Sequence, residues 1–589
     1  MKNEKEKKLE AVRHSLSHIL MQALENLYGA IPGVGPAIED GFYHDFDAKD
    51  QVTSDDLPKI EEEMKRIVKE NYKIEKEEKV INEGIKFLKD KKYIYTAELA
   101  EDLKEKGEKK ITFYKQDGFI NMCKGPHVES TGKINFKSFK LTKVAGAYWK
   151  GSEKNKMIQR IYGIAFDNPK DLKKHVAMLE EAEKRDHRKI GKDMDLFVFS
   201  DVVGKGLPLW TSKGAIIRRE LENFIVEEEM KRGYEHVYTP DIAKIDLYKK
   251  SGHYPYYKDS MYSPIKIDEE EFMLRPMTCP HHFELYTSKP RSYKDLPMRI
   301  AELAKLYRYE QSGELSGLMR VRSFCLADAH IICADKNQAG EEIDKALGLI
   351  EDIAKIFGLK MGEEYSYRLS LGDRGDDKKY YKDDKAWNDA EEILRKVLKS
   401  RKAKFIEAPG EAAFYGPKID IQMKNVRGKE DTAFTVQYDF VMPERFNLVY
   451  TDKKGKEKKA VVVHRSSVGA IERTVAFLIE RYAGAFPVWL SPSQVKIIAV
   501  SENHVEFSQK LAQEFKDKKI RVEVDSSDET VGNKIRKAVQ EKPPYILVIG
   551  DKEVGSENLN VRDRGGRETR EIKKDDFIEE ILKKINDKS

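Results

Sequence analysis

Arginines, a glutamate and an aromatic residue stand close together in residues 303–333, where they could bind a nucleoside triphosphate. The stretch is predicted to form two apolar strands joined by a polar loop, with Arg308 and Glu310 on the first and Arg320 opening the second. Side chains two apart on a strand share one face. A guanidinium grips phosphate at two points, and a ring such as Phe324 can stack on a base. A solvated hairpin with cross-strand ion pairs fits these residues equally well.

Two pairs of histidine and cysteine residues near the N-terminus could also do chemistry. His14 and His18 are i,i+4 neighbours on a predicted helix, roughly opposite its apolar stripe, so we expect them to face solvent or a cleft. Cys123 and His127 stand four apart beside a Gly-Pro turn. Together they could form a metal site or a hydrolytic site. From the spacing alone, two unrelated surface pairs are the better interpretation.

Length and composition set the frame in which these residues must be positioned. At about 150 residues per domain, a chain of 589 residues is expected to hold about four domains. The net charge is only +5, so any nucleic-acid surface must be local. The four cysteines form no CxxC pair, which fits a reducing cytoplasm. We expect no signal peptide and no membrane span, because no long apolar run is present.

The elements between the motifs indicate an α+β chain of several domains. The runs MDLFVF, FMLRPM, MRIAELAKLY, AFYGPKIDIQM and FTVQYDFVM predict one large, mainly antiparallel sheet flanked by helices. Residues 168–192 are predicted to form one charged connecting helix. The last hundred or so residues alternate strands with helices, which favours an open sheet with helices packed on it. The predicted domains are residues 1–165, 166–192, 193–487 and 488–589.

Three motifs in order resemble those of the class II aminoacyl-tRNA synthetases. R-x-E, a loop and VRSF resemble motif 2, and LSGLMRVRSF with DAHIIC is similar to the threonyl-tRNA synthetase family. EHVYTPDI with Pro240 resembles motif 1, and SSVGAIERTVAFLIE with Gly469 and Arg473 resembles motif 3. Any one motif alone would be a weak signal. The resemblance implies the class II catalytic fold, ATP-dependent joining of threonine to tRNA(Thr), and a homodimer built through motif 1.

The same resemblance assigns the ATP site. It implies that Arg308 holds the α-phosphate and that Glu310 fixes the adenine end. Phe324 is expected to stack on adenine, and Arg320 and Arg473 to grip the triphosphate tail and the adenine. Mg²⁺ is expected to accompany ATP.

The resemblance also implies a zinc site made of Cys279, His330 and His464. One thiolate and two imidazoles suit Zn²⁺, and three protein ligands leave a fourth position open. Asp328 is expected to hydrogen-bond the threonine hydroxyl. Three further residues are expected in the substrate pocket: Tyr415, Lys418 and Gln437.

HxxxH followed by CxxxH, and then by AGAYWKG and MIQRIYG, resembles the editing domain of threonyl- and alanyl-tRNA synthetases. This implies that His14, His18, Cys123 and His127 line a pocket where seryl-tRNA(Thr) is hydrolysed. The family carries Asp two positions before the cysteine, where this chain has Asn121, a departure that bears on the editing chemistry. The chain begins at the editing-like helix, so we do not expect the family's small ubiquitin-like domain before it.

The C-terminal region resembles the anticodon-binding domain of class IIa synthetases. Lys534, Arg536 and Lys537 fall on one predicted helix and could contact RNA. An α/β module without an RNA role fits the pattern as well. Two alternatives to the whole interpretation are a prolyl- or seryl-tRNA synthetase and a catalytically silent paralogue. The former would not combine the Cys/His/His trio with the HxxxH and CxxxH pairs, and the latter would not need all the motif arginines.

Overall fold

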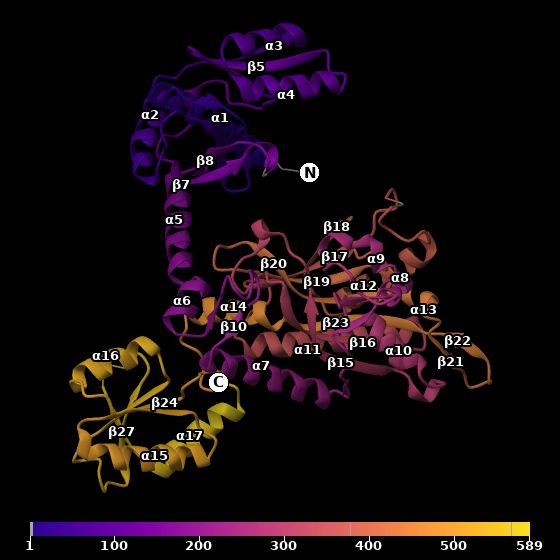
Figure 1. Cartoon of the computed structure of the whole chain (residues 1–589), viewed down its shortest axis with the longest axis vertical. Coiled ribbons are helices and arrows are strands. Elements are labelled where there is room, and N and C mark those ends of the chain that lie inside the picture. Colours follow the sequence, from indigo (N-terminus) through magenta and orange to yellow (C-terminus); the bar gives the residue numbers. More distant parts are fainter. Residues whose placement is uncertain (1–3, 153, 377, 567) are drawn as a thin grey trace. The chain divides into compact units, whose positions relative to one another are not determined.

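The computed structural model describes residues 4–152, 154–376, 378–566 and 568–589 (Figure 1). Two compact units form, Met1–Glu180 and Glu181–Ser589. Helices and mainly antiparallel sheets occur in both, which confirms the predicted multidomain α+β class. Among the described residues, no helix is long and apolar enough to cross a membrane.

Helix α1 (Glu4–Tyr28) forms the centre of the first unit. Its residues Leu16 and Leu20 are fully buried against Phe42 of the neighbouring sheet and Ile60 of α2 (Leu57–Lys69). The sheet runs in the order β1-β3-β8-β7, with β2 paired to β3. Its strands are β1 (Ile31–Pro32), β2 (Ala37–Ile38), β3 (Gly41–Asp47), β7 (Phe139–Tyr148) and β8 (Met157–Ala165).

A second, three-stranded antiparallel sheet completes this unit. Its strands are β4 (Ile74–Val80), β5 (Lys110–Gln116) and β6 (Phe119–Met122), and helices α3 (Ile81–Asp90) and α4 (Ile94–Glu105) pack on it (Figure 1). Cys123 directly follows β6 and therefore leaves the sheet edge beside α1.

The predicted single connecting helix is wrong, because the segment forms two helices. They are α5 (Pro169–Lys184) and α6 (His187–Asp193). Asp186 leaves the helical conformation at ψ 120, and its side chain accepts a hydrogen bond from the backbone N–H of Arg188. A carboxylate in this position caps the start of a new helix.

The second unit is built on an eight-stranded sheet in the order β11-β15-β16-β23-β20-β19-β17-β18. Its inner pairs are antiparallel, while β11–β15 and β17–β18 at the edges are parallel. The strands are β11 (Glu235–His236), β15 (Met298–Tyr307), β16 (Ser323–Cys333), β17 (Tyr365–Leu371), β18 (Phe405–Pro409), β19 (Lys418–Lys424), β20 (Glu430–Asp439) and β23 (Val461–Ala470).

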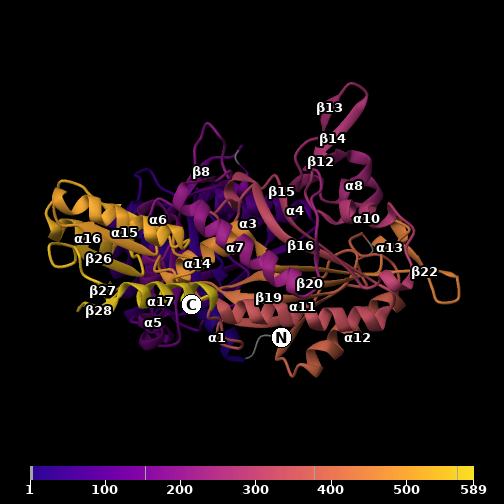
Figure 2. The ribbon, with the colours of Figure 1, turned by 90° about the horizontal axis from the view of Figure 1, so that it is seen from below.

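Helices cover this sheet and supply most of its hydrophobic core. The largest cluster of buried side chains joins the sheet to α7 (Ser212–Lys231), α11 (Lys336–Ile356), α12 (Asp384–Ser400) and α14 (Ile471–Tyr482). Helix α11 contacts β16, β20 and β23, and Figure 2 shows it running along the sheet.

Two of the five runs predicted for the large sheet belong elsewhere. MDLFVF supplies β9 (Phe197–Val198), which pairs with β10 (Leu209–Trp210), and FMLRPM supplies β14 (Glu270–Leu274) of a three-stranded sheet. Both runs have the alternation typical of strands, but alternation does not specify a partner strand.

The motif arginines leave the strands on which they were expected. Strand β15 ends at Tyr307 and β16 begins at Ser323, so Arg308, Glu310 and Arg320 all lie in the loop between them. This loop, residues 308–322, is called the hairpin loop below.

The C-terminal region forms an open sheet in the order β25-β24-β26-β27-β28, as its alternating pattern predicts. The strands are β24 (Val495–Ala499), β25 (Val522–Asp525), β26 (Tyr545–Ile549), β27 (Asn558–Asp563) and β28 (Arg570–Lys573). Helices α15 (Val505–Asp517) and α17 (Lys574–Asn586) pack on one face and α16 (Val531–Glu541) on the other (Figure 1). The prediction that Lys534 contacts RNA is wrong. Lys534 is 3% exposed, and its ammonium donates to the backbone oxygen of Ala499, at 2.9 Å.

Candidate active site

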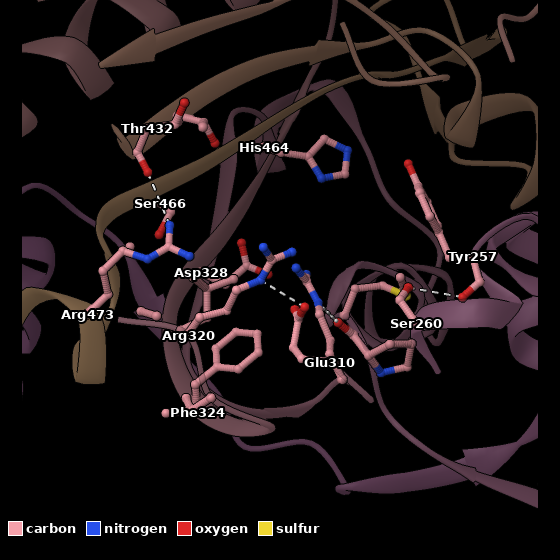
Figure 3. Close-up of a pocket in the computed structure, with 18 of the residues that line it drawn as sticks. Tyr257, Ser260, Glu310, Arg320, Phe324, Asp328, Thr432, His464, Ser466 and Arg473 are labelled. Carbon is pink, nitrogen blue, oxygen red and sulfur yellow. Dashed lines mark hydrogen bonds and ion pairs between the residues drawn. The ribbon is translucent and has the colours of Figure 1, made fainter. Parts of the chain in front are cut away.

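A cavity of about 820 Å³ lies in the second unit and gathers most of the residues predicted for the site (Figure 3). Figure 3 shows Glu310, Arg320 and Phe324 grouped together, with His464 across the cavity. The predicted residues that line it are Cys279, Arg308, Glu310, Arg320, Phe324, Asp328, His330, Tyr415, Gln437, His464 and Arg473.

Arg308 and Arg473 are held in the cavity by backbone oxygens. Arg308 donates from Nε to the oxygen of Pro276 at 3.3 Å, and its guanidinium lies 5.2 Å from the Phe324 ring centre. Arg473 donates to the backbone oxygen of Met319 at 3.2 Å and to that of Thr432 at 3.1 Å. Burial lowers the pKa of both groups. Each guanidinium has five N–H donors, so most of them remain for an anionic ligand.

Glu310 is fixed by arginines of its own loop. Its carboxylate accepts a hydrogen bond from Arg320 at 2.9 Å, and its backbone oxygen accepts one from Arg322 at 2.9 Å. The Arg322 guanidinium also lies 4.4 Å from the Tyr309 ring centre. These contacts hold the hairpin loop in one conformation at the mouth of the cavity.

Strand register brings Cys279, His330 and His464 together. His330 pairs with His464 across β16 and β23, and His464 pairs with Gln437 across β20. Directly opposed residues share one face of a sheet. Cys279 arrives from the start of α10 (Cys279–Thr287), and the three possible ligand atoms lie within 4.8 Å of one another.

Hydrogen bonds to carboxylates, directly for His464 and through His282 for His330, determine which ring nitrogen of each histidine carries the proton. His464 Nε2 lies 2.6 Å from Asp439, whose other oxygen accepts two backbone N–H groups. His330 Nδ1 lies 2.8 Å from His282 Nδ1, and His282 Nε2 lies 3.2 Å from Glu302. Because a carboxylate can only accept, the ring N–H groups are His464 Nε2–H toward Asp439, His282 Nε2–H toward Glu302 and His330 Nδ1–H toward His282. His464 Nδ1 and His330 Nε2 therefore keep lone pairs for a ligand.

The charge state of Glu302 supports this assignment. Burial opposes its ionisation, but hydrogen bonds from His282 and Thr239 and the charge of Arg275 lower its pKa to about 2. An ionised Glu302 accepts a hydrogen bond from the N–H at His282 Nε2. His282 Nδ1 is therefore unprotonated and accepts a hydrogen bond from the N–H at His330 Nδ1. Sequence reasoning gave neither His282 nor Glu302 a role in the site, and neither residue lines the cavity.

The trio suits a soft divalent cation. Burial lowers the pKa of His330 and raises that of Cys279. Neutral imidazoles are ready ligands, and a bound cation reverses the effect of burial on a thiol. One sulfur and two nitrogens, with carboxylates that orient the imidazoles, match a donor set that zinc accepts.

The predicted substrate-pocket residues divide into two groups. Tyr415 donates to Gln437 at 2.7 Å and stacks on His464 with ring centres 5.0 Å apart. Lys418 does not line the cavity, although it pairs with Gln437 in the sheet. Its ammonium binds the buried Asp420 at 2.8 Å, so the arrangement gives no support to a substrate contact.

His253 lines the cavity and was missed by sequence reasoning. It is 3% exposed, and its Nδ1 lies 2.8 Å from the Ser251 hydroxyl. Burial, helped by the charge of His464, lowers the pKa of His253 to about 3. A pKa this low keeps the imidazole neutral, so the ring can take part in hydrogen bonds as a neutral group. Only its place in the aromatic run SGHYPYY could have drawn attention to it.

The first unit holds a second cluster, formed by His14, His18, Cys123 and His127. Cys123 Sγ lies 3.1 Å from His14 Nε2 and 3.3 Å from His127 Nε2. The His18 and His127 rings have centres 4.4 Å apart. The His127 Nδ1 atom lies 3.1 Å from the hydroxyl of Ser15, which sequence reasoning missed.

A cavity of about 640 Å³ opens beside this cluster and is lined by His14, His18, Asn121 and Cys123. Both helix histidines thus face a cavity rather than solvent, and His18 is 3% exposed because Phe119 and His127 pack on it. Burial lowers the pKa of all three histidines, to about 3 for His127, and raises that of Cys123 to about 11. The histidines and the thiol are therefore neutral near pH 7.

Asn121 stands where the resembled family has a carboxylate. It is 2% exposed, and its side-chain oxygen accepts the backbone N–H of Met122 at 2.8 Å. An amide cannot accept a proton from water as a carboxylate can. Asn121 therefore cannot act as a general base in a hydrolysis here.

Comparisons with known proteins agree with this architecture. Residues 262–482 match the family described as tRNA synthetase class II core domain (G, H, P, S and T). Residues 494–584 match the family described as Anticodon binding domain, and residues 111–162 match the Threonyl and Alanyl tRNA synthetase second additional domain. The sheet, the hairpin loop and the matched core together define a class II aminoacyl-tRNA synthetase.

Relatives identify the member of that class. The chain is 49% identical to the threonine–tRNA ligase of Staphylococcus carnosus (strain TM300) and 48% identical to that of Geobacillus kaustophilus (strain HTA426), covering 98% of this chain and 88% of each relative. A crystal structure of the RNA binding domain of threonyl-tRNA synthetase from Cryptosporidium parvum Iowa II is 34% identical, with a TM-score of 0.64, over 68% of this chain and 98% of that one. The chain belongs to the threonine–tRNA ligase family, and the prolyl and seryl alternatives find no support.

Proposed function

We propose that this chain joins threonine to tRNA(Thr) in two steps, forming threonyl-adenylate and pyrophosphate from ATP and then esterifying the tRNA 3′ end. The observation that carries the proposal is one cavity that contains both the motif arginines and the Cys279, His330 and His464 trio. Charging of purified tRNA with labelled threonine tests it. A product that forms only with ATP and threonine is expected, and a protein that binds tRNA without charging it would favour the silent paralogue.

The arginines and the aromatic ring would bind ATP. Arg308 holds the α-phosphate, and Arg320 and Arg473 neutralise the triphosphate tail beside adenine, which stacks on Phe324. Glu310 fixes the adenine end. Mg²⁺ enters with ATP. Most of the rate enhancement comes from charge placed in advance where the transition state needs it.

Cys279, His330 and His464 would hold one Zn²⁺ ion, which when bound supplies a Lewis acid for the amine and hydroxyl of threonine. Asp328, buried in the same cavity, accepts a hydrogen bond from that hydroxyl. Tyr415 and Gln437 complete the amino-acid pocket. His253 lines the same cavity as a neutral imidazole.

Removal of His282 should weaken zinc binding without removing a ligand. In His282→Ala, His330 loses the partner that keeps its N–H pointing away from the cavity, and loss of such support lowers metal affinity about 10–100-fold. Competition with a chromophoric chelator measures the affinity. The neighbouring His281→Ala is the matched control, because within the described structure neither ring nitrogen of His281 has a hydrogen-bond partner. Equal zinc affinities for both variants would contradict the assignment.

The first unit would remove serine attached by mistake. A missing methyl group separates serine from threonine by only about 1–3 kcal/mol, or roughly 10–200-fold. Protein synthesis needs more than that, so hydrolysis at a second site is required. His14, His18, Cys123 and His127 would line the pocket in which water cleaves the ester.

The double variant His14→Ala with His18→Ala should charge threonine normally and accumulate seryl-tRNA. Intact charging shows that the catalytic unit is folded, since the two residues lie in a separate compact unit. His175→Ala in the same unit, outside the cluster, is the control. Chromatography of the esterified amino acid gives the result. Wild-type enzyme that already accumulates seryl-tRNA would contradict active editing and direct attention to Asn121.

Three wider assignments complete the proposal. The domains are residues 1–165 for editing, 166–192 for the connection, 193–487 for catalysis and 488–589 for the anticodon. The enzyme acts as a homodimer through the motif 1 region and works in the cytoplasm, where tRNA is charged. Light scattering of the purified protein tests the dimer.

A further inference from the structure

His187 opens α6, and both of its ring nitrogens are hydrogen bonded. Nδ1 lies 2.7 Å from a carboxylate oxygen of Glu480 on α14, and Nε2 lies 3.1 Å from the backbone nitrogen of Leu318. The Leu318 amide can only donate, so Nε2 accepts and Nδ1 carries the proton that is donated to Glu480. The ring is 3% exposed, so water does not compete for these bonds.

The Leu318 end of this contact belongs to the hairpin loop at the cavity. Leu318 and Met319 both line the cavity, and Met319 is also held by Arg473 at 3.2 Å. The loop is thus fixed from two directions, by His187 of α6 and by Arg473 of α14. Gly317 has φ +49, and a Cβ there would lie 2.2 Å from His187 Nε2. The loop backbone therefore rests directly on the imidazole.

A metal ion is a weaker explanation of the same group. Ligand atoms of Asp186, His187 and Glu480 do lie within 4.8 Å of one another. However, the Nε2 lone pair is occupied by the Leu318 amide, and Asp186 is bound by Arg188 at 2.9 Å. The hydrogen bonds already account for every member of the group.

We propose that His187 is a positioning residue that holds the hairpin loop in the conformation that binds ATP. The inference rests on the proposed binding of ATP in the cavity. Helix α6 is the end of the connecting segment, so this role for His187 makes that end of the segment part of the support for the ATP site. Neither the motifs nor the comparisons assign a role to this histidine.

The first test measures KM for ATP and KM for threonine in pyrophosphate exchange. Loss of one buried hydrogen bond corresponds to a change of about five- to tenfold, so His187→Ala should raise KM for ATP by that factor and leave KM for threonine within about twofold. His187→Gln should recover most of the loss, because its amide oxygen can accept from the Leu318 amide. His504→Ala is the matched control. His504 is likewise buried, between the Ser501 amide and Asp551, but on the C-terminal sheet domain.

A second pair of variants tests the contact from the loop side. Gly317→Ala pushes the loop off the ring and should raise KM for ATP as His187→Ala does. Gly313→Ala is the control in the same loop, because a Cβ there meets nothing within 4 Å. An unchanged KM for ATP in both His187→Ala and Gly317→Ala would overturn the inference. An equal rise in KM for ATP and KM for threonine would overturn it as well. So would a metal ion that wild-type protein binds through Asp186, His187 and Glu480 and that His187→Ala loses. A wild-type enzyme without exchange activity would overturn the proposed function, and the inference with it.

Discussion

Arg308→Ala should lower the rate of threonine-dependent ATP–pyrophosphate exchange by about 10²-fold or more. The side chain lies in the cavity over Phe324, and it is the motif arginine expected to hold the α-phosphate, where charge develops during adenylate formation. Exchange measured at saturating ATP and threonine reports the chemical step rather than weaker binding alone. The fold should persist, because the Arg308 side chain makes only one hydrogen bond to protein among those described, to the backbone oxygen of Pro276.

Arg395→Ala provides the control for this experiment. Arg395 is bound to Glu407 through two hydrogen bonds and lies outside the cavity, so its removal takes away one guanidinium without touching the site. Near-normal exchange by Arg308→Ala would remove Arg308 from the catalytic site. An equal loss in both variants would assign the effect to general damage.

Cys279→Ala should abolish both bound zinc and threonine activation. Metal analysis of the purified wild-type protein should find about one Zn²⁺ ion per chain, the number expected for a single three-ligand site. Removal of one of the three buried ligands leaves two imidazoles, which do not hold the ion against a chelator. Cys333→Ala is the matched control, because Cys333 is a buried cysteine on the strand that carries His330 but lies outside the trio.

The amino-acid preference of the wild type belongs to the same prediction. Valine has nearly the shape of threonine but no hydroxyl, and an apolar pocket separates such a pair by only about 10²-fold. A site that binds the hydroxyl through polar groups such as Asp328 should reach about 10⁴-fold in kcat/KM. Active wild-type protein without zinc would rule out this account of threonine selection.

The sequence predicted the members of the site better than their support. Cys279, His330 and His464 could be named from a family resemblance, and the register of β16, β20 and β23 explains why they meet. His282 and Glu302 could not be named, because their role depends on a chain of hydrogen bonds between segments that no spacing rule connects.

The wrong predictions about the fold also arise because tertiary contacts cannot be seen in local sequence patterns. The charge of Lys534 is typical of an RNA-binding helix, but its ammonium is buried and donates a hydrogen bond to the backbone oxygen of Ala499. The run MDLFVF alternates as a strand should, yet its partner is β10 rather than the large sheet. The break at Asp186 depends on one capping hydrogen bond within a segment that is charged throughout. Local patterns indicate an element, whereas its neighbours decide where that element lies.

The most direct test of the central claim is ATP–pyrophosphate exchange with each of the twenty amino acids in turn. We expect fast exchange with threonine, exchange with serine that is slower by roughly 10–200-fold, and almost none with valine. Exchange that is fastest with any other amino acid, or absent with all of them, would contradict it.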